Sequence, residues 1–318
     1  MKIYYFLIQS DIMKGRNVIV TGGAGFIGSN LVEELAKENN VLVIDNLHTG
    51  STKNLEEAMK TGNVKFVNDD SKNINNYGFD ADYVFHIGIY SSSPMYKENP
   101  MLVGEVVSGI TSVLEYAKKK NAKLVFASSS SIYNGIKPPH KEDAIPLVTD
   151  YYTEARIACE RLAELYAKLH GIDVSAMRFF SVYGKHEESK GRYANLATQF
   201  LRSMKKGEPP VIYGDGSQKR DFVFVSDVVE AMLKAAEKNS GFNIYNVGTG
   251  RNHDINTLVE KINNLLGKDI KPRYVEMPMK NYVYETLADT KKSEEKLGFK
   301  ASIDLDKGLE LINQYYGV

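Results

Sequence analysis

The sequence of 318 residues contains one cysteine, no net charge and no long apolar run. A single cysteine, Cys159, excludes an intrachain disulfide and a cysteine-rich metal site, and the six histidines show no metal-ligand spacing. Forty basic residues balance forty acidic ones, so the overall charge favours neither nucleic acid nor an anionic membrane as a partner. No stretch approaches the length of a transmembrane helix. We therefore expect a cytoplasmic protein with no bound metal ion.

The chain divides into three predicted parts. Residues 1–15 form an N-terminal extension, whose apolar run is too short to span a bilayer and lacks a small-residue cleavage site. Short apolar runs then alternate with amphipathic helical patterns over residues 16–180, which predicts a doubly wound parallel sheet. Gly- and Pro-punctuated segments over residues 181–318 predict a smaller C-terminal α/β lobe, with a return to the first domain near residues 222–236.

A glycine-rich segment, Thr-Gly-Gly-Ala-Gly-Phe-Ile-Gly at residues 21–28, joins a predicted strand to the start of an amphipathic helix. Its glycines permit a tight turn, a close approach of the backbone to phosphates and close packing of helix on sheet. The helix N-terminus offers unpaired N–H groups to an anion. We predict that a dinucleotide pyrophosphate binds here, at Gly22, Gly25, Phe26, Ile27 and Gly28.

The next predicted strand, residues 41–44, ends in Asp45. A carboxylate at this position of a dinucleotide-binding fold meets the ribose hydroxyls of the adenosine. Because it would repel a 2′-phosphate, Asp45 favours NAD over NADP.

Two later segments carry candidate catalytic groups. Four serines, residues 128–131, stand at the end of the strand predicted over residues 124–127. Tyr152 and Arg156 lie four residues apart on the helix predicted over residues 150–170, and therefore share one helix face. A phenol with an ordinary pKa of about 10 needs a nearby positive charge to act as a base near neutral pH. Arg156 and an oxidised nicotinamide ring can supply that charge.

From about residue 16 to residue 316 the sequence resembles the extended short-chain dehydrogenase/reductase family, and within it the UDP-sugar 4-epimerases. The matching segments are residues 21–28, 45–50, 85–87, 128–133, 178–184, 212–216 and 220–225. The resemblance implies an NAD-binding Rossmann domain followed by a nucleotide-sugar-binding domain. It also implies NAD as cofactor, a UDP-sugar as substrate and a homodimer.

The resemblance assigns a role to each matching residue. Ser129 would hydrogen-bond the reacting sugar oxygen, Tyr152 would be the general base, and Arg156 stands where the family has a lysine. The residues implied in cofactor binding besides the glycine-rich segment are Asp45, Asn46, Asp70, Ser71, Tyr152 and Arg156. Those implied in substrate binding are Ser129, Ser130, Ser181, Asn195, Leu196, Tyr213 and Arg220.

The implied reaction is 4-epimerisation of a UDP-sugar by transient oxidation at C4, on UDP-glucose and UDP-galactose or on the UDP-GlcNAc and UDP-glucuronate type. Related dehydratases carry Thr-Asp-Glu in the segment where this chain has serines, and related decarboxylases keep a glutamate beside it. The serine run therefore favours epimerisation. Two alternatives stay open: a different oxidoreductase acting on an activated sugar, and an NAD-binding protein with low activity.

Three departures from the family pattern motivate the last alternative. Arg156 replaces a lysine, Val106 replaces an active-site asparagine, and Met279 stands where a second diphosphate-binding arginine is expected. Arginine keeps its charge at any relevant pH and can hydrogen-bond ribose hydroxyls. If charge alone matters, the Arg156→Lys variant should retain or gain activity.

Overall fold

Seven parallel strands form the central sheet, in the order β11-β6-β5-β4-β1-β2-β3. They are β1 (Asn17–Thr21), β2 (Asn40–Ile44), β3 (Val64–Val67), β4 (Tyr83–His86), β5 (Lys123–Ser129), β6 (Val174–Phe179) and β11 (Phe242–Val247). The order runs outward from β1 to β3 on one side and from β4 to β11 on the other. Ligands of such sheets bind at the carboxyl ends of the strands, where the order reverses. That point lies between β1 and β4.

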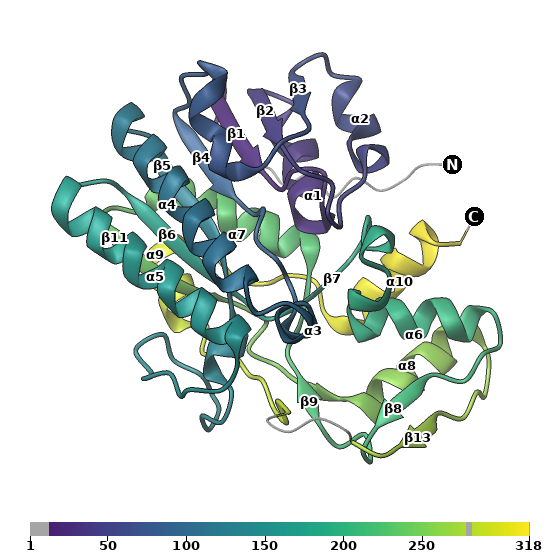
Figure 1. Cartoon of the computed structure of the whole chain (residues 1–318). Coiled ribbons are helices and arrows are strands. Elements are labelled where there is room, and N and C mark those ends of the chain that lie inside the picture. Colours follow the sequence, from purple (N-terminus) through teal and green to yellow (C-terminus); the bar gives the residue numbers. More distant parts are fainter. Residues whose placement is uncertain (1–12, 278–281, 318) are drawn as a thin grey trace.

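Helices cover both faces of this sheet, because successive strand residues point to opposite sides. Val18 and Val20 of β1 pack in the apolar cluster that holds residues of α1 (Phe26–Leu35) and α7 (Val225–Lys238). Ile19 between them packs in the opposite cluster, with α4 (Leu102–Lys120) and α5 (Tyr151–His170). Figure 1 shows α4 and α5 side by side over the sheet. The predicted doubly wound parallel sheet is confirmed.

Shorter elements connect these strands and helices. They are η1 (Thr52–Leu55), α2 (Glu56–Met59), η2 (Ser71–Tyr77), α3 (Ser93–Glu98) and η3 (Ser130–Tyr133). Residues 52–59 thus form a 3₁₀ turn followed by one α-helical turn. The long helix α4 begins at Leu102, after the separate helix α3.

The chain after β6 builds a smaller group of elements below the sheet edge in Figure 1. They are β7 (Ser181–Tyr183), η4 (Glu188–Tyr193), α6 (Leu196–Lys205), β8 (Val211–Tyr213), β9 (Lys219–Arg220), β10 (Phe222–Phe224), β12 (His253–Asp254), α8 (Ile255–Leu266), β13 (Arg273–Val275) and α10 (Leu305–Tyr315). Helix α9 (Lys291–Leu297) instead packs against α7 and β11 of the main domain. A third apolar cluster lies among α6, α8 and α10. The chain returns to the main sheet through α7 and β11, and the domain division near residue 180 remains a proposal.

The structure, a computed structural model, describes residues 13–277 and 282–317. Most of the predicted N-terminal extension and Met279 lie outside these ranges. Within them, no helix combines the length and apolarity needed to cross a bilayer.

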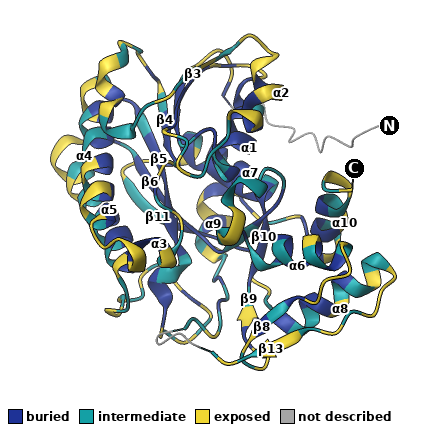
Figure 2. Ribbon diagram, turned by 45° about the vertical axis from the view of Figure 1, so that its right-hand side comes forward, coloured by how far each residue is buried: buried dark blue, intermediate teal, exposed yellow. Residues whose placement is uncertain are grey.

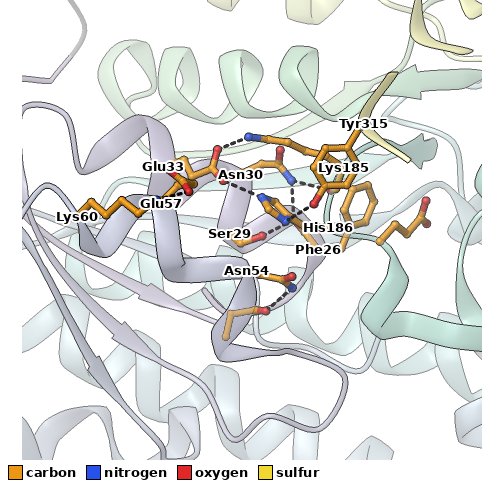
Figure 3. Close-up of polar contacts among 12 residues, drawn as sticks. Phe26, Ser29, Asn30, Glu33, Asn54, Glu57, Lys60, Lys185, His186 and Tyr315 are labelled. Atoms are coloured by element: carbon orange, nitrogen blue, oxygen red, sulfur yellow. Dashed lines mark hydrogen bonds and ion pairs between the residues drawn. The ribbon is translucent and has the colours of Figure 1, made fainter. Parts of the chain in front are cut away.

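A polar cluster joins α1 to the later part of the chain (Figure 3). The Glu33 carboxylate of α1 pairs with Lys185, and its Oε1 lies 2.7 Å from His186 Nε2. The other ring nitrogen of His186 lies 3.0 Å from the hydroxyl of Tyr315 in α10. His186 itself has a φ of +68°, in the left-handed region. These contacts hold the loop after β7 and the last helix against the helix that begins at the glycine-rich turn.

Candidate active site

A cavity of about 380 Å³ opens at the carboxyl ends of the central strands. Its walls come from the turns after β1, β2, β3, β4 and β5 and from the segments around Ser181 and Asn195. Thirteen of the sequence-predicted site residues that line it are Gly22, Gly25, Phe26, Ile27, Gly28, Asp45, Asn46, Asp70, Ser71, Ser129, Ser130, Tyr152 and Arg156. The predicted cofactor and catalytic residues are thus brought together in one place.

The glycine-rich turn leaves a cradle in the cavity wall. Gly22 has a φ of +71°, and a Cβ there would lie 2.4 Å from the Cα of Gly88. A Cβ on Gly28 would lie 2.1 Å from the carbonyl oxygen of Gly22, so only glycine lets α1 approach β1 this closely. The N-cap of α1 is Gly25, which has no side chain to satisfy the N–H groups of the first turn. This geometry fits a dinucleotide pyrophosphate.

The residues predicted to bind the adenosine, Asp45 and Asp70 among them, lie in the turns after β2 and β3. Asp45 is buried, and its carboxylate accepts hydrogen bonds from the N–H groups of Ala24 at 2.9 Å and Leu47 at 2.7 Å. Burial raises the pKa of Asp45, and these two hydrogen bonds oppose the shift. Asn46 donates to the carboxylate of Asp70 at 3.3 Å, and Ser71 begins η2 beside it. The predicted adenosine contacts therefore form one connected wall.

The hydroxyls predicted to be catalytic lie at the start of α5 and the end of β5. Ser129 is the last residue of β5, and its Oγ accepts a hydrogen bond from the N–H of Ser131. Tyr152 stands in the first turn of α5, whose N-cap Asp150 accepts from the N–H of Thr153 at 2.8 Å. The ring of Tyr96 packs against that of Tyr152, with centroids 5.4 Å apart.

Arg156 is buried beneath Tyr152 and donates hydrogen bonds to two main-chain carbonyls. Its Nη1 donates to Ala127 at 3.1 Å and its Nη2 donates to Tyr90 at 2.7 Å, while its buried Nε has no hydrogen-bond partner among the described residues. The guanidinium carbon lies 4.9 Å from the centroid of the Tyr152 ring. Burial by itself lowers the pKa of Arg156, but the phenols of Tyr152 and Tyr96 raise it overall. A permanent positive charge therefore lies against the proposed base.

His86 also lines the cavity and is a second titratable group at the strand ends. Its Nδ1 lies 2.6 Å from the hydroxyl of Thr21. Burial and the charge of Arg156 lower the pKa of His86 to about 3, so its ring stays neutral near pH 7. The imidazole is a hydrogen-bonding support for β1 rather than a source of charge.

Sequence reasoning missed the buried network behind the serine run. Glu160, one turn after Arg156 on α5, accepts hydrogen bonds from Ser128 Oγ at 2.6 Å and from Arg178 Nε at 2.9 Å and Nη2 at 2.7 Å. Arg178 also donates to the hydroxyl of Tyr133 at 2.8 Å. The network fixes the end of β5 against α5, and so sets where the Ser129 and Tyr152 side chains lie. Arg178 lies in residues 178–184, one of the segments that match the family, but the sequence does not show that it pairs with Glu160.

The predicted substrate contacts divide into two groups. Ser181 at the start of β7 and Asn195 at the N-cap of α6 line the cavity, as Ser129 and Ser130 do. Leu196, Tyr213 and Arg220 do not line it, although the structure describes all three. Arg220 donates to the carbonyls of Lys219 and Tyr284, and its guanidinium lies 5.2 Å from the Tyr282 ring centroid. Their substrate roles remain predictions.

Lys190 of η4 also lines the cavity and was not predicted from the sequence. Its Nζ lies 5.6 Å from the ring centroid of Phe26 and 3.8 Å from Oε1 of the buried Glu187. Glu187 also accepts a hydrogen bond from the N–H of Asn195 at 2.6 Å. Lys190 thus places a positive charge between the start of α1 and the start of α6. In sequence it is one of forty basic residues, with no motif to distinguish it.

Comparison with known proteins identifies similar chains. The NAD dependent epimerase/dehydratase family matches residues 18–248. A UDP-glucuronate 4-epimerase of Thermodesulfobacterium geofontis is 34% identical, over 92% of this chain and 93% of the relative. A UDP-N-acetyl-alpha-D-glucosaminuronate decarboxylase of Bacillus cytotoxicus is 30% identical, over 95% of this chain and 98% of the relative. The structure of a UDP-N-acetylglucosamine 4-epimerase from Methanobrevibacter ruminantium M1, in complex with UDP-N-acetylmuramic acid, superposes with a TM-score of 0.90. That protein is 31% identical, and the match covers 96% of this chain and 99% of the other.

Proposed function

The chain belongs to the NAD-dependent epimerase/dehydratase family of extended short-chain dehydrogenases/reductases, and we propose that it is a UDP-sugar 4-epimerase. The family places it among the NAD-dependent enzymes that epimerise or decarboxylate UDP-sugars. Among these reactions, the residues of the cavity favour epimerisation at C4.

The composition of the catalytic end of the cavity supports this choice. The residues around Tyr152 and Arg156 on the β5 side are the four serines 128–131, which carry hydroxyls but no carboxylate. The acidic residues that line the cavity, Asp45, Asp69, Asp70 and Glu105, come from the turns after β2 and β3 and from α4. Hydroxyl groups suffice to bind a sugar oxygen and move its proton, whereas loss of water needs a further acid and base. This arrangement also favours epimerisation over the decarboxylation known for a relative.

The chain's residues support a proton transfer at C4. When bound, NAD supplies the hydride acceptor. Tyr152 takes the proton of the 4-hydroxyl, and the guanidinium carbon of Arg156 lies 4.9 Å from the centroid of its ring. Ser129 hydrogen-bonds the same sugar oxygen and holds it in reach of Tyr152. Tyr152 would then return the proton to the same oxygen once the 4-keto sugar has turned its other face to the cofactor, which gives the C4 epimer.

The purified protein should convert at least one of UDP-glucose, UDP-GlcNAc and UDP-glucuronate to its C4 epimer, detected by proton NMR. Release of carbon dioxide from UDP-glucuronate would instead make it a decarboxylase. Net formation of NADH would support the oxidoreductase alternative, and no turnover of any nucleotide sugar would support an NAD-binding protein of low activity.

We further propose that two copies associate through α4 and α5. These helices pack on one another, and Figure 2 shows exposed residues along their outer side. Leu165 and Leu169, one turn apart on α5, are 48% and 66% exposed. Light scattering should give twice the mass of one chain, and replacing both leucines with glutamate should give the single-chain mass.

A further inference from the structure

The loops after β2 and β4 touch through one pair of rings. His48 follows β2 and Tyr90 follows β4; their ring centroids are 4.9 Å apart and their planes are inclined by 82°, an edge-to-face contact. Both residues line the cavity. Because β1 lies between β2 and β4 in the sheet, the contact spans the strand end from which the glycine-rich turn begins.

Hydrogen bonds to its main-chain carbonyl hold Tyr90 in place. The carbonyl oxygen of Tyr90 accepts hydrogen bonds from Nη2 of Arg156 at 2.7 Å and from the hydroxyl of Tyr96 at 3.1 Å. The Tyr96 ring also packs edge-to-face on Tyr90, with centroids 6.4 Å apart. Arg156 and Tyr96 are buried. Because Arg156 and Tyr152 are both on α5, the hydrogen bond from Arg156 attaches this loop to the helix that carries Tyr152.

The loop that carries His48 is hydrogen-bonded to Asp45 and Asn46, which are predicted to bind the adenosine. The main-chain N–H of His48 donates to Asn46 Oδ1 at 3.1 Å, and that of Leu47 donates to Asp45 Oδ1 at 2.7 Å. The side chain of His48 is exposed. The two rings therefore connect a solvent-facing loop to one whose main chain is hydrogen-bonded to the buried Arg156.

We propose that His48 and Tyr90 form an aromatic clasp that closes over bound NAD and sets the rate at which the dinucleotide leaves. The rings bridge the two loops between which the dinucleotide lies, so release requires them to separate. Slow release suits a reaction that regenerates its cofactor in every cycle. Arg156 acts in the clasp as a positioning residue, through the carbonyl of Tyr90. The inference rests on the NAD dependence of the family and not on the proposed 4-epimerase activity.

The test measures cofactor release without any sugar substrate. Protein loaded with radiolabelled NAD is chased with excess unlabelled NAD, and the label retained on the protein is followed with time. An edge-to-face aromatic contact corresponds to a roughly two- to twelve-fold change in rate, so His48→Ala should release label faster by about that factor. Tyr90→Leu should also release faster, whereas Tyr90→Phe keeps the ring and should release at the wild-type rate.

His170→Ala is the matched control, because His170 also makes an edge-to-face ring contact, with Tyr166, but lies at the far end of α5. Its release rate should equal that of the wild type. Equal release from His48→Ala and the wild type, with equal label bound at time zero, would overturn the proposal. So would equally fast release from Tyr90→Phe and Tyr90→Leu. Failure of the wild type to bind label would overturn both the clasp and NAD binding, whereas absence of 4-epimerase turnover would leave this measurement intact.

Discussion

The guanidinium carbon of Arg156 lies 4.9 Å from the centroid of the Tyr152 ring, while two of its nitrogens are committed to the carbonyls of Ala127 and Tyr90. The arginine therefore serves Tyr152 in two ways. It places a buried positive charge against the phenol, and it ties the end of β5 to the loop after β4.

Arg156→Lys should lose activity, because the contacts of Arg156 show that more than its charge matters. One ammonium group keeps the charge but cannot reproduce the planar fork that reaches both carbonyls. Loss of one charge-assisted hydrogen bond, about 1.5–3 kcal/mol, corresponds to a fall in kcat of roughly ten- to a hundred-fold. Steady-state kinetics with a UDP-sugar measure this effect.

Arg161→Lys is the control for that experiment, because its side chain lies on the same helix and is 79% exposed. Its kcat should match the wild type. If Arg156→Lys also matches the wild type, the bridge between Ala127 and Tyr90 plays no part in catalysis.

Glu160→Gln should destabilise the fold. Arg178 and Glu160 are 3% and 6% exposed, and the substitution leaves the buried guanidinium without a countercharge. Breaking one partner of a buried pair costs about 3–5 kcal/mol. Urea unfolding should show a loss of this size. Glu164→Gln, which removes a partner of the exposed Lys168 on the same helix, should change the free energy of unfolding by less than about 1 kcal/mol. Equal effects of the two variants would contradict the assignment.

The contacts of Glu33 with Lys185 and His186 should stabilise the fold at neutral pH and lose this effect in acid. Burial raises the pKa of Glu33, but hydrogen bonds and charges from His186 and Lys185 outweigh it, and the net pKa falls below 4.5. A carboxyl whose folded pKa is lowered stabilises the fold above its unfolded pKa, and this contribution is lost as the pH falls through the folded value. The wild type should thus exceed Glu33→Gln in unfolding free energy at neutral pH, and the difference should shrink below about pH 4.5. A difference that grows on acidification would contradict this account.

Lys190→Met should raise KM for the UDP-sugar more than it lowers kcat. Lys190 brings a positive charge into the cavity between the starts of α1 and α6, a position suited to a diphosphate. Loss of a charge-assisted contact predicts a rise in KM of roughly ten-fold or more. Lys190→Arg keeps the charge and should stay near the wild-type KM. An unchanged KM in Lys190→Met would remove this residue from the substrate site.

The parts of this molecule that the sequence predicts are those encoded by neighbouring residues. The apolar runs of β1 and β2, the glycine-rich turn and Asp45 carry their signals within a few positions, and the structure gathers them as expected. The central sheet's seventh strand, β11, was not predicted, because it returns to β6 after a separate group of elements. The contacts of Arg156 with Tyr90, and of Glu160 with Arg178, join segments far apart in the chain. Only the fold reveals such pairs.

The most direct measurement follows a deuterium atom at C4 of the substrate. UDP-glucose, UDP-GlcNAc and UDP-glucuronate, each deuterated at C4, are incubated with the protein, and the products are analysed by NMR and mass spectrometry. Transient oxidation at C4 predicts that at least one sugar yields its C4 epimer with the deuterium retained, and that Tyr152→Phe yields almost none. Absence of an epimer from all three sugars, or an epimer in which the deuterium has exchanged with water, would contradict the proposed 4-epimerase mechanism.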